Sequence, residues 1–331
     1  MTQDLPIPVF RTSERGTFDT CWQKWWWAWR EGLRPNTEDR TALWFGTGVH
    51  LALAEWYCGP GLKRGPHPAD TFEDYVGDQV WAMNIASEKE DAKYIDAKDL
   101  GVAMLEGYVD KYGADDSWSI IAPEQAFQVN IPNLSGKGIL GVYAGTFDLI
   151  YRDLTDNKIY LGEHKTAKAI RTGHLPLDNQ AGSYWLIAPE ILQHSGLLKK
   201  GEVIGGINYN FLKKSLPDDR PQDAFGRKLN KNGTVSKRQP GSLFEREMVL
   251  RDQAERRSQL RRIQNELSWM NLARKYPDRI TKSPSTNCEF FCEFHNMCVL
   301  HERGGNDWKE YRRAMFHRED PYADHRKSTE G

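Results

Sequence analysis

Two neighbouring stretches of the chain, GTFDLIYRD at residues 145–153 and NKIYLGEHKTA at residues 157–167, have the pattern of β-strands. Both are rich in β-branched and aromatic residues, which favour strands. The Asp-Asn pair at 156–157 is typical of a turn between them. A similar run, SWSIIAPEQAFQVNI at residues 117–131, precedes them. The sequence therefore predicts three consecutive strands.

The second and third of these strands carry charged residues that pairing would bring together. Side chains alternate along a strand, so Glu163 and Lys165 must point to the same face. In a hairpin, Asp148 lies beside Glu163. Two carboxylates and an ammonium at one spot suit a divalent cation and the hydrolysis of phosphodiester bonds, with the lysine orienting the attacking water. The alternative is a surface ion pair on an exposed strand.

The segments on either side of the strands predict helices and two further strands. Aromatic, apolar and charged runs at 15–31, 41–57 and about 69–112 indicate a helical first third. The later segments predict a helix over 176–195, a strand over 202–212, a long loop over 213–241, a strand over 242–250 and a charged helix over about 251–275. The central order is αβββαβ.

These elements divide the chain into regions of one elaborated domain. The regions are an N-terminal helical region (1–112), a central α/β region with a basic insertion (113–250), a C-terminal helix and cysteine region (251–303) and a polar tail (304–331). A length of 331 residues fits this division. The tail is rich in His, Arg, Asp and Glu, and we expect it to be solvated and partly disordered.

The overall charge excludes a global attraction to polyanions. Lys and Arg total 45 against 46 Asp and Glu, so any nucleic-acid site must be local. No run of about 18 apolar residues is present, and the N-terminus lacks the order of a secretion signal. We therefore expect a cytoplasmic protein without membrane spans.

Together, Asp148, the Glu163-x-Lys165 pattern and two later residues resemble the PD-(D/E)XK nuclease superfamily. Upstream, FGTGVHLALAEWY at 45–57 resembles the G-x-x-x-H segment of its RecB-like branch, and Gln180 with Tyr184 matches that branch's Q-x-x-x-Y motif. The resemblance implies an α/β fold with a central mixed sheet flanked by helices. It also implies cleavage of DNA that depends on Mg²⁺ or Mn²⁺.

The same resemblance implies roles for individual residues. The metal ligands would be His50, Asp148 and Glu163, while Lys165 would activate or position the water. Gln180 and Tyr184 lie on one helix face and would position the DNA and the active site. Taken alone, His50 also fits a core histidine, and the glutamine and tyrosine a helix–sheet contact. A secondary acidic candidate lies on the first predicted strand, Glu124.

Five cysteines, an odd number, argue against a disulfide framework. Three of them crowd into a C-x3-C-x5-C pattern, and their arrangement with one N-terminal cysteine resembles the iron-sulfur nucleases of the RecB-like branch. The resemblance implies a [4Fe-4S] cluster that joins the two ends of the chain through Cys21, Cys288, Cys292 and Cys298. The usual spacing in that branch is C-x2-C-x5-C, from which this chain departs. Zinc, with His295 as a ligand, is the competing interpretation; for Cys58 we prefer a buried structural thiol.

The insertion over 213–241 has an excess of cations that could follow a phosphate backbone. The candidate DNA-binding residues are Lys213, Lys214, Arg227, Lys228, Lys231, Lys237 and Arg238. A solvated loop is the equal alternative. Tryptophans near the N-terminus could stack on bases, but four of them have helical core spacing, which favours packing: Trp22, Trp25, Trp26 and Trp29.

By resemblance, the expected activity is that of an exonuclease on single-stranded DNA or DNA ends, with 5′-to-3′ polarity favoured, in phage or bacterial replication, recombination or repair. No helicase phosphate loop is recognised, so unwinding would need a helicase or recombination partner. A homo-oligomer is compatible with the sequence. The alternatives are a non-cutting iron-sulfur subunit that binds DNA in a nuclease–helicase or CRISPR adaptation complex, and a nuclease that acts on RNA.

Overall fold

A computed structural model describes residues 7–36, 41–58, 61–83 and 88–323. The helices are α1 (Thr12–Thr20), α2 (Trp22–Trp25), a π-helical turn (Trp26–Arg30), α3 (Thr41–Trp56), α4 (Pro68–Met83), α5 (Glu88–Tyr112), α6 (Asn179–His194), α7 (Gln253–Lys275), α8 (Asn287–Phe291), α9 (His295–Glu302) and α10 (Asp307–Met315). The strands are β1 (Val9–Phe10), β2 (Leu33–Pro35), β3 (Trp118–Pro132), β4 (Ile139–Asp153), β5 (Lys158–Ala167), β6 (Gly206–Lys213), β7 (Phe244–Val249) and β8 (Phe316–Arg318). Short 3-10 turns precede α6 and follow α7.

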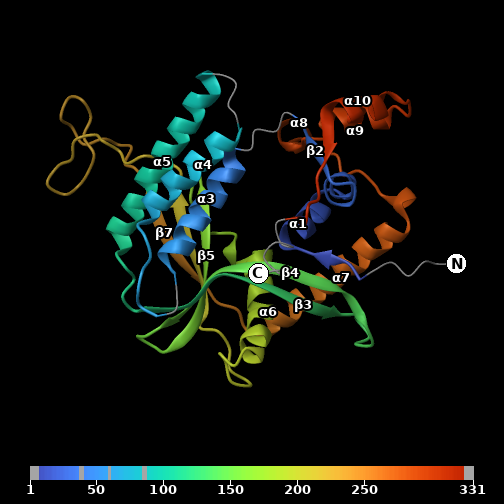
Figure 1. Cartoon of the computed structure of the whole chain (residues 1–331), viewed down its shortest axis with the longest axis horizontal. Helices are drawn as coiled ribbons and strands as arrows, with labels where there is room; N and C mark the ends of the chain where they lie inside the picture. The colour runs from blue at the N-terminus through green and yellow to red at the C-terminus, as the bar shows by residue number, and fades with distance from the viewer. Residues whose placement is uncertain (1–6, 37–40, 59–60, 84–87, 324–331) are drawn as a thin grey trace.

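A mixed sheet forms the centre of the molecule (Figure 1). Strands β3, β4 and β5 are antiparallel neighbours, β5 pairs with β6 in parallel, and β7 closes the edge antiparallel to β6. The three predicted central strands and the helix α6 that follows them are confirmed. The short β1, which the sequence did not predict, pairs with β4 in parallel at Val142 and Tyr143.

Alternation along the strands gives the sheet two apolar faces, each covered by helices. On β4, Ile150 packs with α6 and α7, while its neighbours Leu149 and Tyr151 pack with α3, α4 and α5. Figure 1 shows α3, α4 and α5 beside one another on one side of the sheet. Burial on both faces explains why these strands read as nearly continuous apolar runs.

The two ends of the chain pack together in a small lobe. Strand β2 pairs antiparallel with β8, and buried Trp27 contacts the ring of Phe294 from the C-terminal region. Within the predicted polar tail, α10 is solvated as expected, but β8 inserts Phe316 into the apolar cluster that holds Trp27 and Phe294. A few apolar side chains in a polar composition are sufficient to fix the segment. Residues 324–331 of the predicted tail lie outside the described residues.

The N-terminal tryptophans pack, as their spacing predicts. Trp25 and Trp27 are buried, while Trp22, Trp26 and Trp29 are partly buried against the core. Within the described residues, no helix combines the length and apolar composition that crossing a membrane requires.

Candidate active site

The predicted catalytic residues meet where β4 and β5 part. The backbone pairing of the two strands runs from Asp153 and Lys158 to Leu149 and Gly162. Beyond the last backbone pair, the backbone N–H of His164 donates to the side chain of Asp148, with 2.7 Å between the nitrogen and Oδ2. A carboxylate oxygen thus accepts where a backbone carbonyl would in a regular ladder. The diverging strands therefore leave a fork with a buried carboxylate in it.

Glu163 and Lys165 lie on one face of β5, as the alternation predicts, and form an ion pair of 2.5 Å. Helix α6 adds an amide to this pair. The Gln180 side chain accepts from the Lys165 Nζ and donates to the Glu163 Oε1, both over 2.8 Å, and it also donates to the Tyr184 hydroxyl. That hydroxyl donates to the Thr146 carbonyl of β4 over 2.6 Å. One helix thus fixes the rotamers of the charged pair and ties it to the neighbouring strand.

A second group of ligand atoms lies on the other side of Asp148. The Nδ1 of His50, on α3, lies 3.5 Å from one oxygen of Asp148 and 3.5 Å from one oxygen of Glu124. One donor atom from each of these three residues lies within 4.8 Å of the other two. Three donors at this spacing can hold a metal ion.

Glu124 reaches this group through an unusual backbone conformation. Its φ is +43°, a left-handed value that costs a non-glycine residue about 1–2 kcal/mol. Its neighbours on β3 pair with residues on either side of Asp148, so Glu124 lies opposite that carboxylate. Strain of this kind persists where the surroundings impose it, and it gathers at functional sites. The structure thus raises the secondary candidate to a full member of the site.

The carboxylates make the site strongly attractive to cations. Burial disfavours the imidazolium of His50, but the charge of Asp148 and hydrogen bonds to Asp148 and Glu124 raise its pKa to about 11. Burial alone would raise the pKa of Asp148, but the charge and hydrogen bond of His50, with the charge of Lys165, lower it overall. The charge of the His50 imidazolium therefore offsets part of the negative charge of these oxygens.

Glu163 also fits a cation ligand. Burial, followed by the charge of Asp148, raises its pKa to about 7, and Lys165 only partly offsets this rise. Its Oε2 is buried and has no hydrogen-bond partner. Since a buried unpaired oxygen is costly, this atom is suited to a cation beside Asp148. Its membership of the metal site stays a prediction, because the three grouped donors are those of His50, Glu124 and Asp148.

His164, which the sequence did not single out, contacts two residues of the site, His50 and Asp148. Its ring stacks on Tyr57 and lies edge-on to His50, and its Nδ1 is 2.9 Å from the amide nitrogen of Asn210. Burial lowers its pKa to about 3, so the ring is neutral. Its position between the two motif residues carried no signal, since a histidine there is ordinary in any buried strand.

All four predicted cluster cysteines line a single cavity of about 900 Å³ in the small lobe. Each is half-buried, and all are free thiols. Among the described residues, no three of their sulfurs come within 4.8 Å of one another. His295, the alternative zinc ligand, lines the same cavity. The fifth cysteine, predicted as a buried structural thiol, is exposed, so that expectation for Cys58 is wrong.

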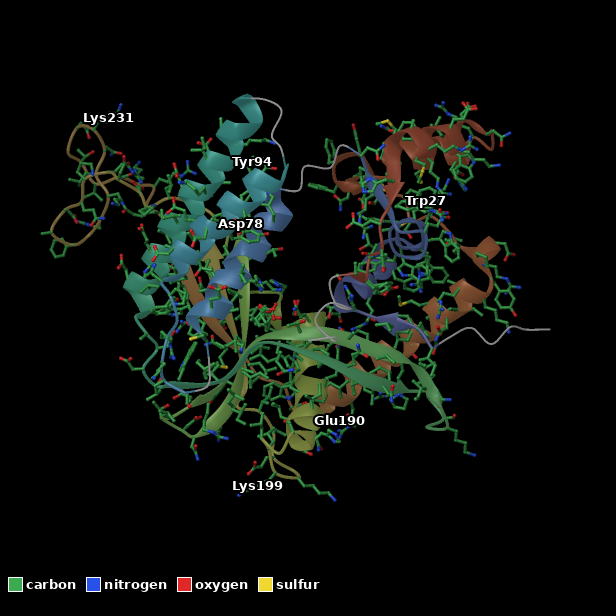
Figure 2. The ribbon with its side chains drawn as sticks, in the orientation of Figure 1. Trp27, Asp78, Tyr94, Glu190, Lys199 and Lys231 are labelled. Atoms are coloured by element: carbon green, nitrogen blue, oxygen red, sulfur yellow. The ribbon has the colours of Figure 1, made fainter. Side chains whose placement is uncertain are left out.

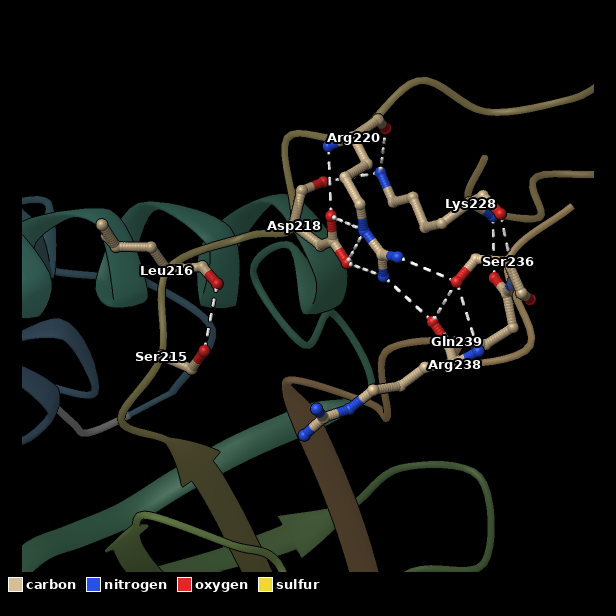
Figure 3. Close-up of polar contacts among 8 residues, drawn as sticks. All are labelled: Ser215, Leu216, Asp218, Arg220, Lys228, Ser236, Arg238 and Gln239. Atoms are coloured by element: carbon tan, nitrogen blue, oxygen red, sulfur yellow. Dashed lines mark hydrogen bonds and ion pairs between the residues drawn. The ribbon is translucent and has the colours of Figure 1, made fainter. Parts of the chain in front are cut away.

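The basic insertion begins at Lys213, which pairs with Ala167 at the end of β5, and the loop beyond it projects beside α5 (Figure 1). It folds on itself through polar contacts (Figure 3). The Arg220 guanidinium pairs with Asp218, and buried Lys228 donates to the carbonyls of both residues. Arg227 pairs with Asp223 over 2.7 Å. Two predicted DNA contacts, Arg227 and Lys228, are therefore engaged within the loop.

The other predicted DNA contacts differ in their surroundings. Lys214 lies over the ring of Phe45, 4.7 Å from its centroid. The side chains of the remaining four form no hydrogen bond or ion pair within the described residues: Lys213, Lys231, Lys237 and Arg238. Binding of DNA by the insertion stays a prediction.

Comparison with known proteins agrees with the geometry of the fork. A sequence model of the PD-(D/E)XK nuclease superfamily matches residues 12–299, which include every fork residue named above and all the cysteines. A comparison with curated proteins found no match.

Proposed function

Because the chain belongs to the PD-(D/E)XK nuclease superfamily, we propose that it is an enzyme that hydrolyses DNA phosphodiester bonds with the help of a divalent metal ion. The observation that carries this proposal is the convergence of His50, Glu124 and Asp148 beside the Glu163–Lys165 pair. An ion pair with a purely structural role would not need three further ligand atoms or a strained glutamate next to it.

In the proposed hydrolysis, some residues of the fork would bind the metal ion and another would orient the water and the phosphate. His50, Glu124 and Asp148 would hold Mg²⁺ or Mn²⁺, and Glu163, whose buried Oε2 has no hydrogen-bond partner, would be a further ligand. Such an ion supplies Lewis acidity and lowers the pKa of bound water. The Lys165 ammonium stays charged, since Glu163 and Asp148 raise its pKa against the effect of burial. It is placed to orient water and to stabilise negative charge developing on the phosphate.

Gln180 and Tyr184 act as positioning residues. The amide of Gln180 holds the Glu163 carboxylate and the Lys165 ammonium at fixed distances, so neither side chain is free to turn away. Tyr184 is 5 % exposed and anchors the amide to β4. Preorganisation of this kind avoids the cost of reorienting charged groups during the reaction.

We propose further that the substrate is single-stranded DNA or a DNA end, degraded from the 5′ end, in phage or bacterial replication, recombination or repair. This part rests on the resemblance of the Gly-x-x-x-His50 segment and of Gln180 with Tyr184 to the RecB-like branch. A helicase or recombination partner would supply any unwinding, since we recognise no nucleotide phosphate loop in the sequence.

We also propose a [4Fe-4S] cluster in the cysteine cavity. Its support is that Cys21 and the three C-terminal cysteines line one cavity although they are far apart in sequence. A single zinc ion binds sulfur at about 2.3 Å, so three zinc-bound thiolates would lie closer together than any three of these sulfurs do. A cluster binds each thiolate through a different iron atom and therefore suits a wider spacing.

One preparation tests both proposals. Anaerobically purified protein would be scanned for a broad iron-sulfur absorbance near roughly 400 nm, analysed for iron and zinc, and incubated with end-labelled single-stranded DNA and Mg²⁺ or Mn²⁺. Shortening from one end that depends on the metal supports the exonuclease and gives its polarity. Iron without cleavage would favour the non-cutting DNA-binding subunit, and zinc without cleavage would contradict both proposals. A parallel reaction with RNA separates the two substrate classes.

A further inference from the structure

The small lobe has a second cavity, separate from the cysteine cavity, that no motif anticipated. It has a volume of about 520 Å³ and is lined by Leu33, Trp308, Lys309, Arg312, Arg313, Phe316 and Arg318. Most of these residues come from α10 and β8, beyond the segment that the family model matches. Four cations and two aromatic rings around one hollow are an unusual concentration in a chain with a net charge of −1.

Most of the positive charge at this cavity is uncompensated. Arg312 pairs with Glu31 over 2.7 Å. Lys309, Arg313 and Arg318 are exposed, and among the described residues none of them forms an ion pair. The acidic residues of α10, Asp307 and Glu310, lie in its first turn and do not line the cavity. Three like charges at one hollow favour an anionic ligand with several charged groups.

The cavity is built on a firm base. Phe316 is buried and stacks on Phe294, with ring centroids 5.3 Å apart. Strand β8 is paired along its three residues with β2. Beyond it, the Tyr322 hydroxyl donates to buried Glu14 of α1 over 2.6 Å. The cations therefore project from a fixed surface, and binding would not need to order the backbone beneath them.

The aromatic side chains that line the cavity offer a stacking surface, which the binding of phosphate alone does not require. Trp308 is half-buried and lies edge-on to His301, with ring centroids 4.9 Å apart. Cations interleaved with an aromatic side chain are the usual means of binding unpaired nucleic acid, since phosphates contact the cations and a base stacks on the ring. A cavity of this size falls within the range of small-ligand sites, which accommodates one nucleotide unit.

We propose that this cavity binds the backbone of a single DNA strand, with phosphates at Lys309, Arg313 and Arg318 and a base against Trp308. The inference rests on the proposed function and extends it, because it gives the nuclease a strand-binding surface outside the fork. The basic insertion is the less suitable surface, since Arg220, Arg227 and Lys228 are engaged within it.

The test measures binding separately from cleavage. The full-length protein with Lys165→Ala would be titrated against a fluorescein-labelled single-stranded oligonucleotide at several salt concentrations. Adding Arg313→Ala and Arg318→Ala should reduce the slope of log affinity against log salt by about 1.4, since each lost single-strand phosphate contact removes about 0.7. Adding Trp308→Ala instead should lower the affinity about tenfold with the slope unchanged.

A matched control removes the same charge elsewhere. Lys199 and Lys200 are exposed. Lys199 lies at the far end of the molecule from α10 (Figures 1 and 2). The pair Lys199→Ala with Lys200→Ala should leave affinity and slope unchanged. Equal slopes for the parent and the Arg313–Arg318 variant would overturn the inference, and so would an equal loss in the control. If the unmodified protein fails to cleave DNA but the slope still falls, the proposed function fails while the inference stands.

Discussion

The Oδ2 of Asp148 accepts the backbone N–H of His164 over 2.7 Å at the point where β4 and β5 separate. A side chain thus takes over the role of a backbone carbonyl in the ladder. One oxygen of the carboxylate is used to hold the fork together, and the other is turned toward His50. The same bond that fixes the fold therefore fixes the direction of a metal ligand.

Replacement of Lys165 by alanine should lower the rate of DNA cleavage at least about 100-fold, because it removes a charge aimed at the reacting phosphate. Circular dichroism should show an unchanged fold. Lys168, exposed just past the end of β5, provides a matched control, and Lys168→Ala should cut at the normal rate. A Lys165→Ala protein that cleaves normally would exclude the lysine from the mechanism.

Glycine and alanine at position 124 should separate strain from ligation. Glu124→Gly relieves the left-handed backbone and should be more stable than Glu124→Ala by about 1 kcal/mol in the free energy of unfolding. Both variants should bind Mn²⁺ more weakly than the wild type in calorimetric titrations, since both lose a carboxylate. Wild-type Mn²⁺ affinity in either variant would remove Glu124 from the metal site.

Loss of one cavity cysteine should remove the cluster and weaken the small lobe. Cys292→Ala is expected to lose the iron and its brown colour, with a fall in Tm of at least about 4 °C, since binding free energy at such sites is folding free energy. Cys58 lies outside the cavity, so Cys58→Ala should keep the iron. Full iron content in Cys292→Ala would show that this thiol is not a ligand.

Glu14 should make stability fall as pH rises. Burial raises the pKa of this carboxyl, although Arg30, Tyr322 and Trp25 partly oppose the effect. The folded state therefore holds the proton more tightly than the unfolded state. It follows that the free energy of unfolding decreases as pH climbs from the ordinary value of 4.5 through the raised pKa.

Urea unfolding across this pH range, compared between the wild type and Glu14→Gln, checks the effect. The glutamine cannot ionise, so its curve should lack this fall in stability. Glu190→Gln, at an exposed position labelled in Figure 2, is the control and should behave as the wild type. The same pH dependence in the wild type and Glu14→Gln would show that the carboxyl ionises without cost.

Local sequence patterns predicted most of the residues of the site. Alternation along β5 placed Glu163 and Lys165 on one face, and the four-residue spacing on α6 placed Gln180 and Tyr184 on another, because these periods depend only on the backbone. The β8 strand was missed, since its three residues sit in a polar composition and form a strand only through pairing with β2. The exposure of Cys58 was equally hidden, because burial depends on distant neighbours.

The sequence by itself determined the order of the central strands and helices, the nearness of Asp148 to Glu163 on neighbouring strands, and the membership of the family. These follow from side-chain periodicity and from motifs within short stretches of chain. Only the tertiary structure decided that Glu124 joins His50 at the fork and that the cations of α10 and β8 surround a cavity beside Leu33. Each of these depends on contacts between segments far apart along the chain, which no local pattern encodes.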